Sequence, residues 1–105
     1  MNWDAWPFQR VVVFDLEYHH PLGSRPSPRC LVLRELRSGT ELRFWRDEIP
    51  SHPPFPIDKS TLWVAYYSVG DMQCLKDLGW PMPRCLVDLF VEFRQRYNGL
   101  YPTPG

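Results

Sequence analysis

The stretch VVVFDLE, residues 11–17, decides how the rest of the chain is interpreted. Its β-branched and aromatic residues predict a buried strand over residues 11–16. Because side chains alternate along a strand, Asp15 and Glu17 share one face with Val13. Two like charges on one face are costly beside an apolar core unless water, a basic partner or a metal ion compensates them. The strand therefore ends in an acid pair that needs an explanation.

The composition predicts one folded domain over residues 1–105. Hydrophobic residues make up 44% of the chain and aromatic residues 15%, which argues against disorder, while 12 prolines predict long connectors. Lys plus Arg and Asp plus Glu each total 12, so the net charge neither favours nor excludes a nucleic-acid partner.

The cysteines and the apolar runs indicate where the protein works. The three cysteines are widely spaced and form no CxxC pair, which argues against a disulfide framework and a Cys-rich zinc site. The N-terminal residues lack a signal-peptide pattern, and no apolar run approaches the length of a membrane span. We therefore expect a soluble, cytoplasmic protein with reduced thiols and no membrane partner.

Two further strands are predicted in the first half of the chain, at residues 30–36 and 41–46. The short polar connector RSGT between them carries Ser-Gly, which favours a β-hairpin. Prolines and a glycine predict a loop at residues 19–28, and residues 49–60 are too rich in proline for regular structure.

The second half alternates strand and helix. Residues 61–67 are β-branched and aromatic, whereas residues 68–80 change to helical spacing that ends at Gly79. Residues 84–97 fit either one helix or a short strand followed by a helix from about Leu89, and we favour the second interpretation. The order predicts an α/β fold, with a mixed sheet of about five strands and two helices, in which a hairpin precedes a β-α-β crossover.

Four carboxylates fall at the ends of these predicted elements. Asp15 and Glu17 close the first strand, Asp71 opens the first helix, and Asp88 lies near the end of the last strand. A strand order that places residues 61–67 beside the first strand brings Asp71 close to the pair. Carboxylate oxygens are the ligands that Mg²⁺ and Mn²⁺ prefer, and a two-metal centre stabilises both the attacking and the leaving oxygens of a phosphodiester. A metal site would therefore explain the acid pair.

The motifs FDLE, VAYYSVGD and VDLF, in this order, resemble the DEDD-type 3′–5′ exonucleases, in particular the proofreading domain of phage-like family A DNA polymerases. The segments LRELRSGTELRFWRDE, PPFPIDKSTLWVAYYS and LGWPMPRCLVDLFVEFRQRYNG are similar to the same group, so the resemblance covers most of the chain. It implies an RNase H-like fold. It also implies hydrolysis of single-stranded DNA from the 3′ end, with water attacking the phosphodiester between two Mg²⁺ ions.

The resemblance also implies roles for the acids. Asp15 and Glu17 match the two metal-binding acids of the first motif, Asp71 matches the acid of the second, and Asp88 matches a recurring, supportive acid. The third motif of the family, a Tyr or His several residues before a final Asp, is missing, because Glu92 is the only acid after Asp88. The chain thus resembles the N-terminal portion of such a domain, and we expect catalysis that depends on two-metal geometry to suffer heavily.

Aromatic and basic residues are candidates for nucleic-acid binding. Tyr66 and Tyr67 stand where many relatives have an Asn, and their rings are suited to stacking on a terminal base. Phosphate contacts require several arginines on one face of the fold. The candidates are Arg25, Arg29, Arg34, Arg37, Arg43 and Arg46.

Each assignment has a structural alternative. The pair Asp15 and Glu17 also fits exposed strand-end acids, Asp71 fits a capping box that begins at Ser68, and Asp88 fits a helix cap. At the level of function, the alternative is a catalytically inactive module that binds nucleic acid, a polymerase or another protein partner. A second copy of the chain could also complete the site, and an exposed apolar patch is expected where the missing helix would pack.

Overall fold

The structure is a computed structural model that describes residues 5–19, 23, 27–66 and 68–97. Five strands and two α-helices follow one another in the predicted order, and a short 3-10 turn, η2, comes after the third strand. The elements are β1 (Arg10–His19), β2 (Ser27–Glu35), β3 (Glu41–Trp45), η2 (Arg46–Glu48), β4 (Thr61–Ala65), α1 (Ser68–Asp77), β5 (Cys85–Asp88) and α2 (Leu89–Tyr97).

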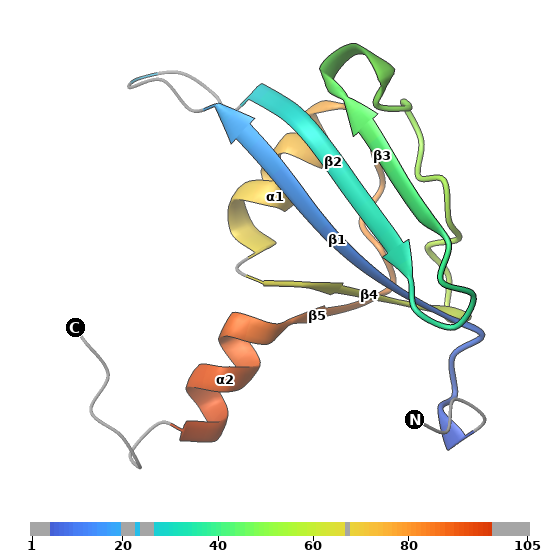
Figure 1. Cartoon of the computed structure of the whole chain (residues 1–105). Helices are drawn as coiled ribbons and strands as arrows, with labels where there is room; N and C mark the ends of the chain where they lie inside the picture. Colours follow the sequence, from blue (N-terminus) through green and yellow to red (C-terminus); the bar gives the residue numbers. More distant parts are fainter. Residues whose placement is uncertain (1–4, 20–22, 24–26, 67, 98–105) are drawn as a thin grey trace.

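The strands form one mixed sheet in the order β3-β2-β1-β4-β5 (Figure 1). β2 pairs antiparallel with both β1 and β3, whereas β4 pairs parallel with both β1 and β5. The predicted β2–β3 hairpin and the β4-α1-β5 crossover are therefore confirmed, as is the mixed α/β sheet of five strands with two helices.

The core lies between the sheet and α1. Alternate residues of β1, namely Val12, Phe14 and Leu16, point to this side and are buried, as sequence periodicity requires. α1 covers the same side, behind the sheet in Figure 1, and contributes Cys74 and Leu75 to the buried cluster. We call this side of the sheet the core face.

Two buried tryptophans attach the proline-rich connector 49–60 to the core. The indole N–H of Trp63 donates to the carbonyl of Pro56 at 2.9 Å, and that of Trp80 donates to the carbonyl of Pro50 at 2.8 Å. The two rings meet edge to face, with centroids 6.3 Å apart. The connector has no regular structure, as predicted, but it is held at two points along its length.

A buried carboxylate, that of Glu35, organises the turn between β2 and β3. It accepts hydrogen bonds from the backbone N–H groups of Val11 at 3.0 Å, Arg37 at 2.9 Å and Ser38 at 2.8 Å. Burial alone would raise the pKa of this carboxyl, but the hydrogen bonds outweigh burial and lower the pKa from 4.5 to about 2. Glu35 is therefore charged at neutral pH although only 4% of its surface is exposed.

Both long strands extend further than the sequence pattern predicted. β1 continues to His19 and β2 begins at Ser27, so the connection between them is shorter than the predicted loop of residues 19–28. The register shifts between Glu17 and Tyr18, and Pro28 lies opposite Tyr18 just beyond the shift. A proline, which donates no backbone hydrogen bond, is tolerated beside such an irregularity, and this explains why proline did not end the strand.

The last two elements are continuous. β5 ends at Asp88 and α2 begins at Leu89, which confirms the predicted strand followed by a helix. The Asp88 carboxylate accepts hydrogen bonds from the backbone N–H groups of Phe90 at 2.9 Å and Val91 at 3.4 Å, so it caps α2. In Figure 1, α2 leads away from the sheet.

Candidate functional site

The side of the sheet opposite the core face carries Asp15, Glu17 and two of the candidate arginines, Arg34 and Arg43. Strand pairing sets residues opposite one another on this side, and directly opposed residues share a face. In Figure 1 this side of β1, β2 and β3 faces the viewer, with α1 behind it. We call it the open face, and its residues on the five strands include Val13, Asp15, Glu17, Cys30, Val32, Arg34, Glu41, Arg43, Trp45, Val64 and Val87.

Asp15 and Glu17 are exposed on the open face, beyond the point where β1 leaves β4. The β1–β4 pairing ends at Val13 and Val64, and Figure 1 shows the two strands diverging past it. The chain leaves β1 toward β2 on one side and leaves β4 toward β5 on the other. Ligand sites in open α/β sheets form where the connections diverge in this way, at the carboxyl ends of the strands.

Neither carboxylate makes a hydrogen bond or ion pair with another described residue, whereas Glu35, Glu41 and Asp88 each have partners. Asp15 lies opposite Val32, and Glu17 lies opposite Cys30. Both residues are exposed, so water screens their mutual repulsion and their oxygens are accessible. Two accessible carboxylates on one face match the hard oxygen donors that Mg²⁺ and Mn²⁺ take, so the donor chemistry fits part of a metal site.

The second motif, VAYYSVGD at residues 64–71, has most of its side chains outside those that the structure describes. α1 begins at Ser68 and includes Asp71, beyond the carboxyl end of β4, as a strand order with β4 beside β1 requires. The side chain of Asp71 is not among those described, and neither is Tyr67. Among the described His, Cys, Asp and Glu side chains, no three gather closely enough to hold a metal ion.

Asp88 occupies a different place from the acid pair. It lies opposite Ala65, a buried residue of the core face, and its carboxylate caps α2. The structure thus shows the capping role and puts Asp88 on the other side of the sheet from Asp15 and Glu17.

Tyr66 follows β4 at the carboxyl end of the sheet. Its side chain is 64% exposed, and its ring meets Phe90 of α2 edge to face at 5.6 Å. The guanidinium of Arg94 lies 5.8 Å from the centre of the Phe90 ring. This aromatic group connects the end of β4 to the first turn of α2 and leaves much of Tyr66 accessible.

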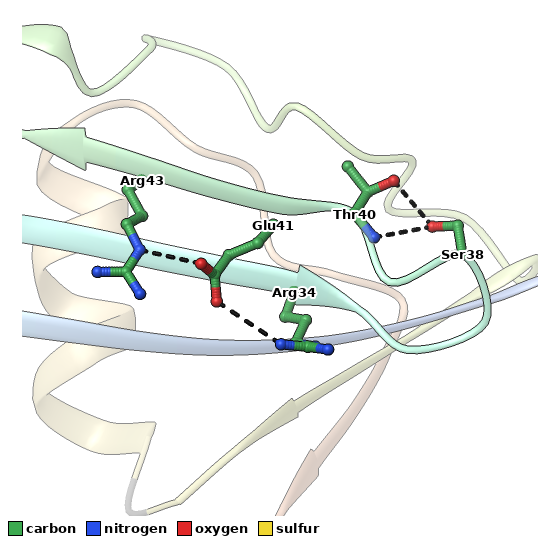
Figure 2. A network of polar contacts seen from close by, with 5 residues as sticks. All are labelled: Arg34, Ser38, Thr40, Glu41 and Arg43. Atoms are coloured by element: carbon green, nitrogen blue, oxygen red, sulfur yellow. Dashed lines mark hydrogen bonds and ion pairs between the residues drawn. The ribbon is translucent and has the colours of Figure 1, made fainter.

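The arginines divide into separate groups. Arg34 and Arg43 lie on the open face and flank Glu41, at 3.9 Å and 3.0 Å respectively (Figure 2). Arg37 instead donates to the carbonyl of Phe8 at 3.0 Å, at the start of the sheet. The other candidates lie apart from this pair or are not described. Arg29 is exposed beside the irregularity in β2, Arg46 begins η2, and Arg25 lies outside the described residues.

A cavity of about 470 Å³ lies on the other side of the molecule, against α1. It is lined by Met72, Gln73, Lys76, Trp80 and Met82. Because α1 covers the core face, this cavity is separated from Asp15 and Glu17 by the sheet. It does not belong to the site that the acid pair suggests.

No protein-family model, curated protein or solved structure matches this chain. Of the described helices, none has the length and apolar character needed to cross a membrane.

Sequence reasoning overlooked two residues that the structure makes prominent. Glu35 continues the alternation of Leu31 and Leu33 toward the core, and this period of two was enough to place it there. Trp45 is the outward residue after Phe44, and the same alternation predicts its exposure on the open face.

Proposed function

We propose that the chain is an RNase H-like, metal-dependent 3′–5′ exonuclease-like domain that acts on phosphodiester bonds of single-stranded DNA. One observation supports this best: Asp15 and Glu17 are exposed, side by side on the open face, where β1 and β4 diverge. The resemblance of FDLE, VAYYSVGD and VDLF to DEDD-type exonucleases implies that this acid pair binds metal ions. The strand order, with β2 antiparallel to its neighbours and a β-α-β crossover beyond β1, is the one that an RNase H-like sheet requires.

The chain's own residues would share the work as follows. Asp15 and Glu17 would hold Mg²⁺ or Mn²⁺, with Asp71 as the third acid, and Asp88, which caps α2, would have the supportive role that the resemblance implies. The bound cation would supply polarisation of the phosphodiester and an activated water. Tyr66 and Tyr67, at the carboxyl end of β4, would stack on the terminal base.

A second candidate function is a catalytically inactive module that binds nucleic acid or a protein such as a polymerase. The observations that favour it are the use of Asp88 as a helix cap and the fact that no three of the described His, Cys, Asp and Glu side chains gather closely enough to hold a metal ion. A second copy of the chain could supply a further acid. The free thiols Cys30, Cys74 and Cys85 are consistent with work in a reducing compartment such as the cytoplasm.

The test is degradation of a 5′-labelled single-stranded DNA in Mg²⁺ or Mn²⁺, with Asp15→Asn, Glu17→Gln and EDTA as comparisons. Active protein shortens the DNA stepwise from its 3′ end, and both substitutions and EDTA abolish the ladder. Mn²⁺ binding, followed by its electron paramagnetic resonance signal, is measured in parallel and weakens in both variants.

The outcomes separate the two candidates. A ladder that survives Asp15→Asn points to a contaminating nuclease and contradicts the proposal. Absence of cleavage by pure wild-type protein, with DNA still bound, supports the inactive module. Cleavage that rises more steeply than protein concentration indicates a site completed by a second copy.

A further inference from the structure

Trp45 is exposed in the same cross-strand row as Glu17. Cys30 of β2 pairs with Glu17 on one side and with Trp45 on the other, so the three side chains share the open face. Trp45 is 66% exposed and makes no ring contact with another described residue. Trp45 therefore offers a large accessible ring, with apolar surface that a stacked ligand can bury.

The neighbouring row joins Asp15 to a basic residue in the same way. Val32 pairs with Asp15 and with Arg43, so Arg43 lies two strands from the acid. Neighbouring strands are about 4.8 Å apart, so the two backbones are separated by roughly 10 Å. The acids and the β3 side chains therefore lie within reach of one short oligonucleotide.

The two arginines of the open face remain available to an anion. Glu41 contacts both Arg34 and Arg43 (Figure 2). Because one carboxylate cannot neutralise two guanidinium groups, these three side chains together keep a net positive charge. The side chains of Arg34 and Arg43 are 57% and 70% exposed. Exposed ion pairs of this kind contribute little to stability, so phosphate can replace Glu41 at small cost.

We propose that Arg34, Arg43 and Trp45 form a binding site for single-stranded nucleic acid on the open face. A base stacks on Trp45 while the two arginines contact phosphates, a combination that holds single strands without sequence preference. The site deepens the proposed function and rests on it, because it carries the strand away from Asp15 and Glu17. A protein surface bound at Trp45 is the competing outcome of the test below.

The experiment measures binding of fluorescein-labelled oligothymidine and oligouridine by anisotropy in EDTA, where no cleavage occurs. Trp45→Ala weakens binding about ten-fold, as expected for the loss of one stacked base. Arg34→Gln with Arg43→Gln weakens it and lowers the slope of log affinity against log salt by about 1.4, for two phosphate contacts on a single strand. Met82→Ala is the matched control, since Met82 is 63% exposed but lines the cavity near α1.

Trp45→Ala should fold normally, because the side chain is mostly in water, and thermal unfolding verifies this. Equal affinities for Trp45→Ala and Met82→Ala overturn the inference, as does wild-type protein that binds neither oligonucleotide at about 100 μM, the weak end of non-specific binding. If Trp45→Ala loses affinity for both oligonucleotides, the site does not distinguish DNA from RNA. If it loses affinity for only one, that nucleic acid is the one the site prefers. If Trp45→Ala weakens binding but the wild type does not cleave DNA in Mg²⁺, the binding site is supported and the hydrolytic function is contradicted. If the wild type cleaves DNA but Trp45→Ala binds as tightly as the wild type, the hydrolytic function is supported and this binding site is contradicted.

Discussion

The carboxylate of Glu35 accepts a 3.0 Å hydrogen bond from the backbone N–H of Val11 and thereby ties the end of β2 to the start of β1. The same carboxylate receives the N–H groups of Arg37 and Ser38 from the following turn. The start of β1, the end of β2 and the turn after β2 thus meet at one charged side chain. Its contribution can be measured independently of any activity.

Glu35→Ala is expected to lower the free energy of unfolding by about 3 kcal/mol, because several backbone donors lose a charged acceptor. The measurement is urea denaturation at neutral pH. Glu41→Ala is the matched control on the same hairpin; its ion pairs are exposed, and the change should stay within about 1 kcal/mol. Equal losses for the two variants would contradict the role assigned to Glu35.

The stability should also depend on pH through Glu35. Its pKa is lower in the folded protein, at about 2, than the 4.5 of an unperturbed carboxyl. The stabilisation is therefore fully present above the unfolded value and is lost as the pH falls from about 5 to 2. Full conversion of the shift gives about 3 kcal/mol, and solvent screening near the turn reduces it to about 2 kcal/mol. The free energy of unfolding of Glu35→Gln, measured by urea denaturation, should depend less on pH over this range than that of the wild type. An equal pH dependence in the two proteins would contradict the role assigned to Glu35.

Asp88→Ala should destabilise α2 by about 1 kcal/mol through loss of its cap. A helix of nine residues has little stability of its own, so amide hydrogen exchange in α2 should accelerate. Asp88→Asn retains an oxygen acceptor and should behave like the wild type. A loss of Mn²⁺ affinity in Asp88→Asn, with the helix intact, would instead show that Asp88 is a metal ligand.

Trp63→Phe should cost about 2 kcal/mol. The ring packs edge to face on Phe14 at 5.6 Å and donates to Pro56, and phenylalanine cannot replace that donor. The connector 49–60 should then become easier to cleave in limited proteolysis. Trp45→Phe makes the same change at an exposed position and should alter stability by no more than about 0.5 kcal/mol.

Asp15→Asn should leave the free energy of unfolding unchanged or raise it by a few tenths of a kcal/mol. Asp15 contacts no described partner through its carboxylate, and removing it relieves repulsion with Glu17. Urea denaturation of the variant checks this. A loss above about 1 kcal/mol would mean that Asp15 is kept for structure rather than for a ligand.

Periodicity and composition together predicted the order of the elements: β1 and β3 alternate between core and water, whereas β4, buried at four of its five residues, was recognised by its β-branched and aromatic content. It predicted the junction at Leu89 as well, since the apolar spacing changes there. The strand ends near His19 and Ser27 were wrong, because cross-strand pairing extends the ladder through Pro28. The strand propensities of single residues do not reveal such pairing between distant parts of the chain.

The candidate site was only partly predictable. The shared face of Asp15 and Glu17 follows from the period of two alone, and their exposure agrees with it. The position of Trp45 beside Glu17 required the register of three strands, because these residues are far apart in the chain. The metal-binding role of the acids stays a prediction.

The two outermost strands, β3 and β5, have five and four residues and leave the sheet open at both edges. Unpaired edges invite strands from other molecules, but short length and alternating charges discourage this. β3 carries Glu41 and Arg43, and β5 passes directly into α2 with no room for a longer ladder. Fibril-like growth along the sheet is thus disfavoured.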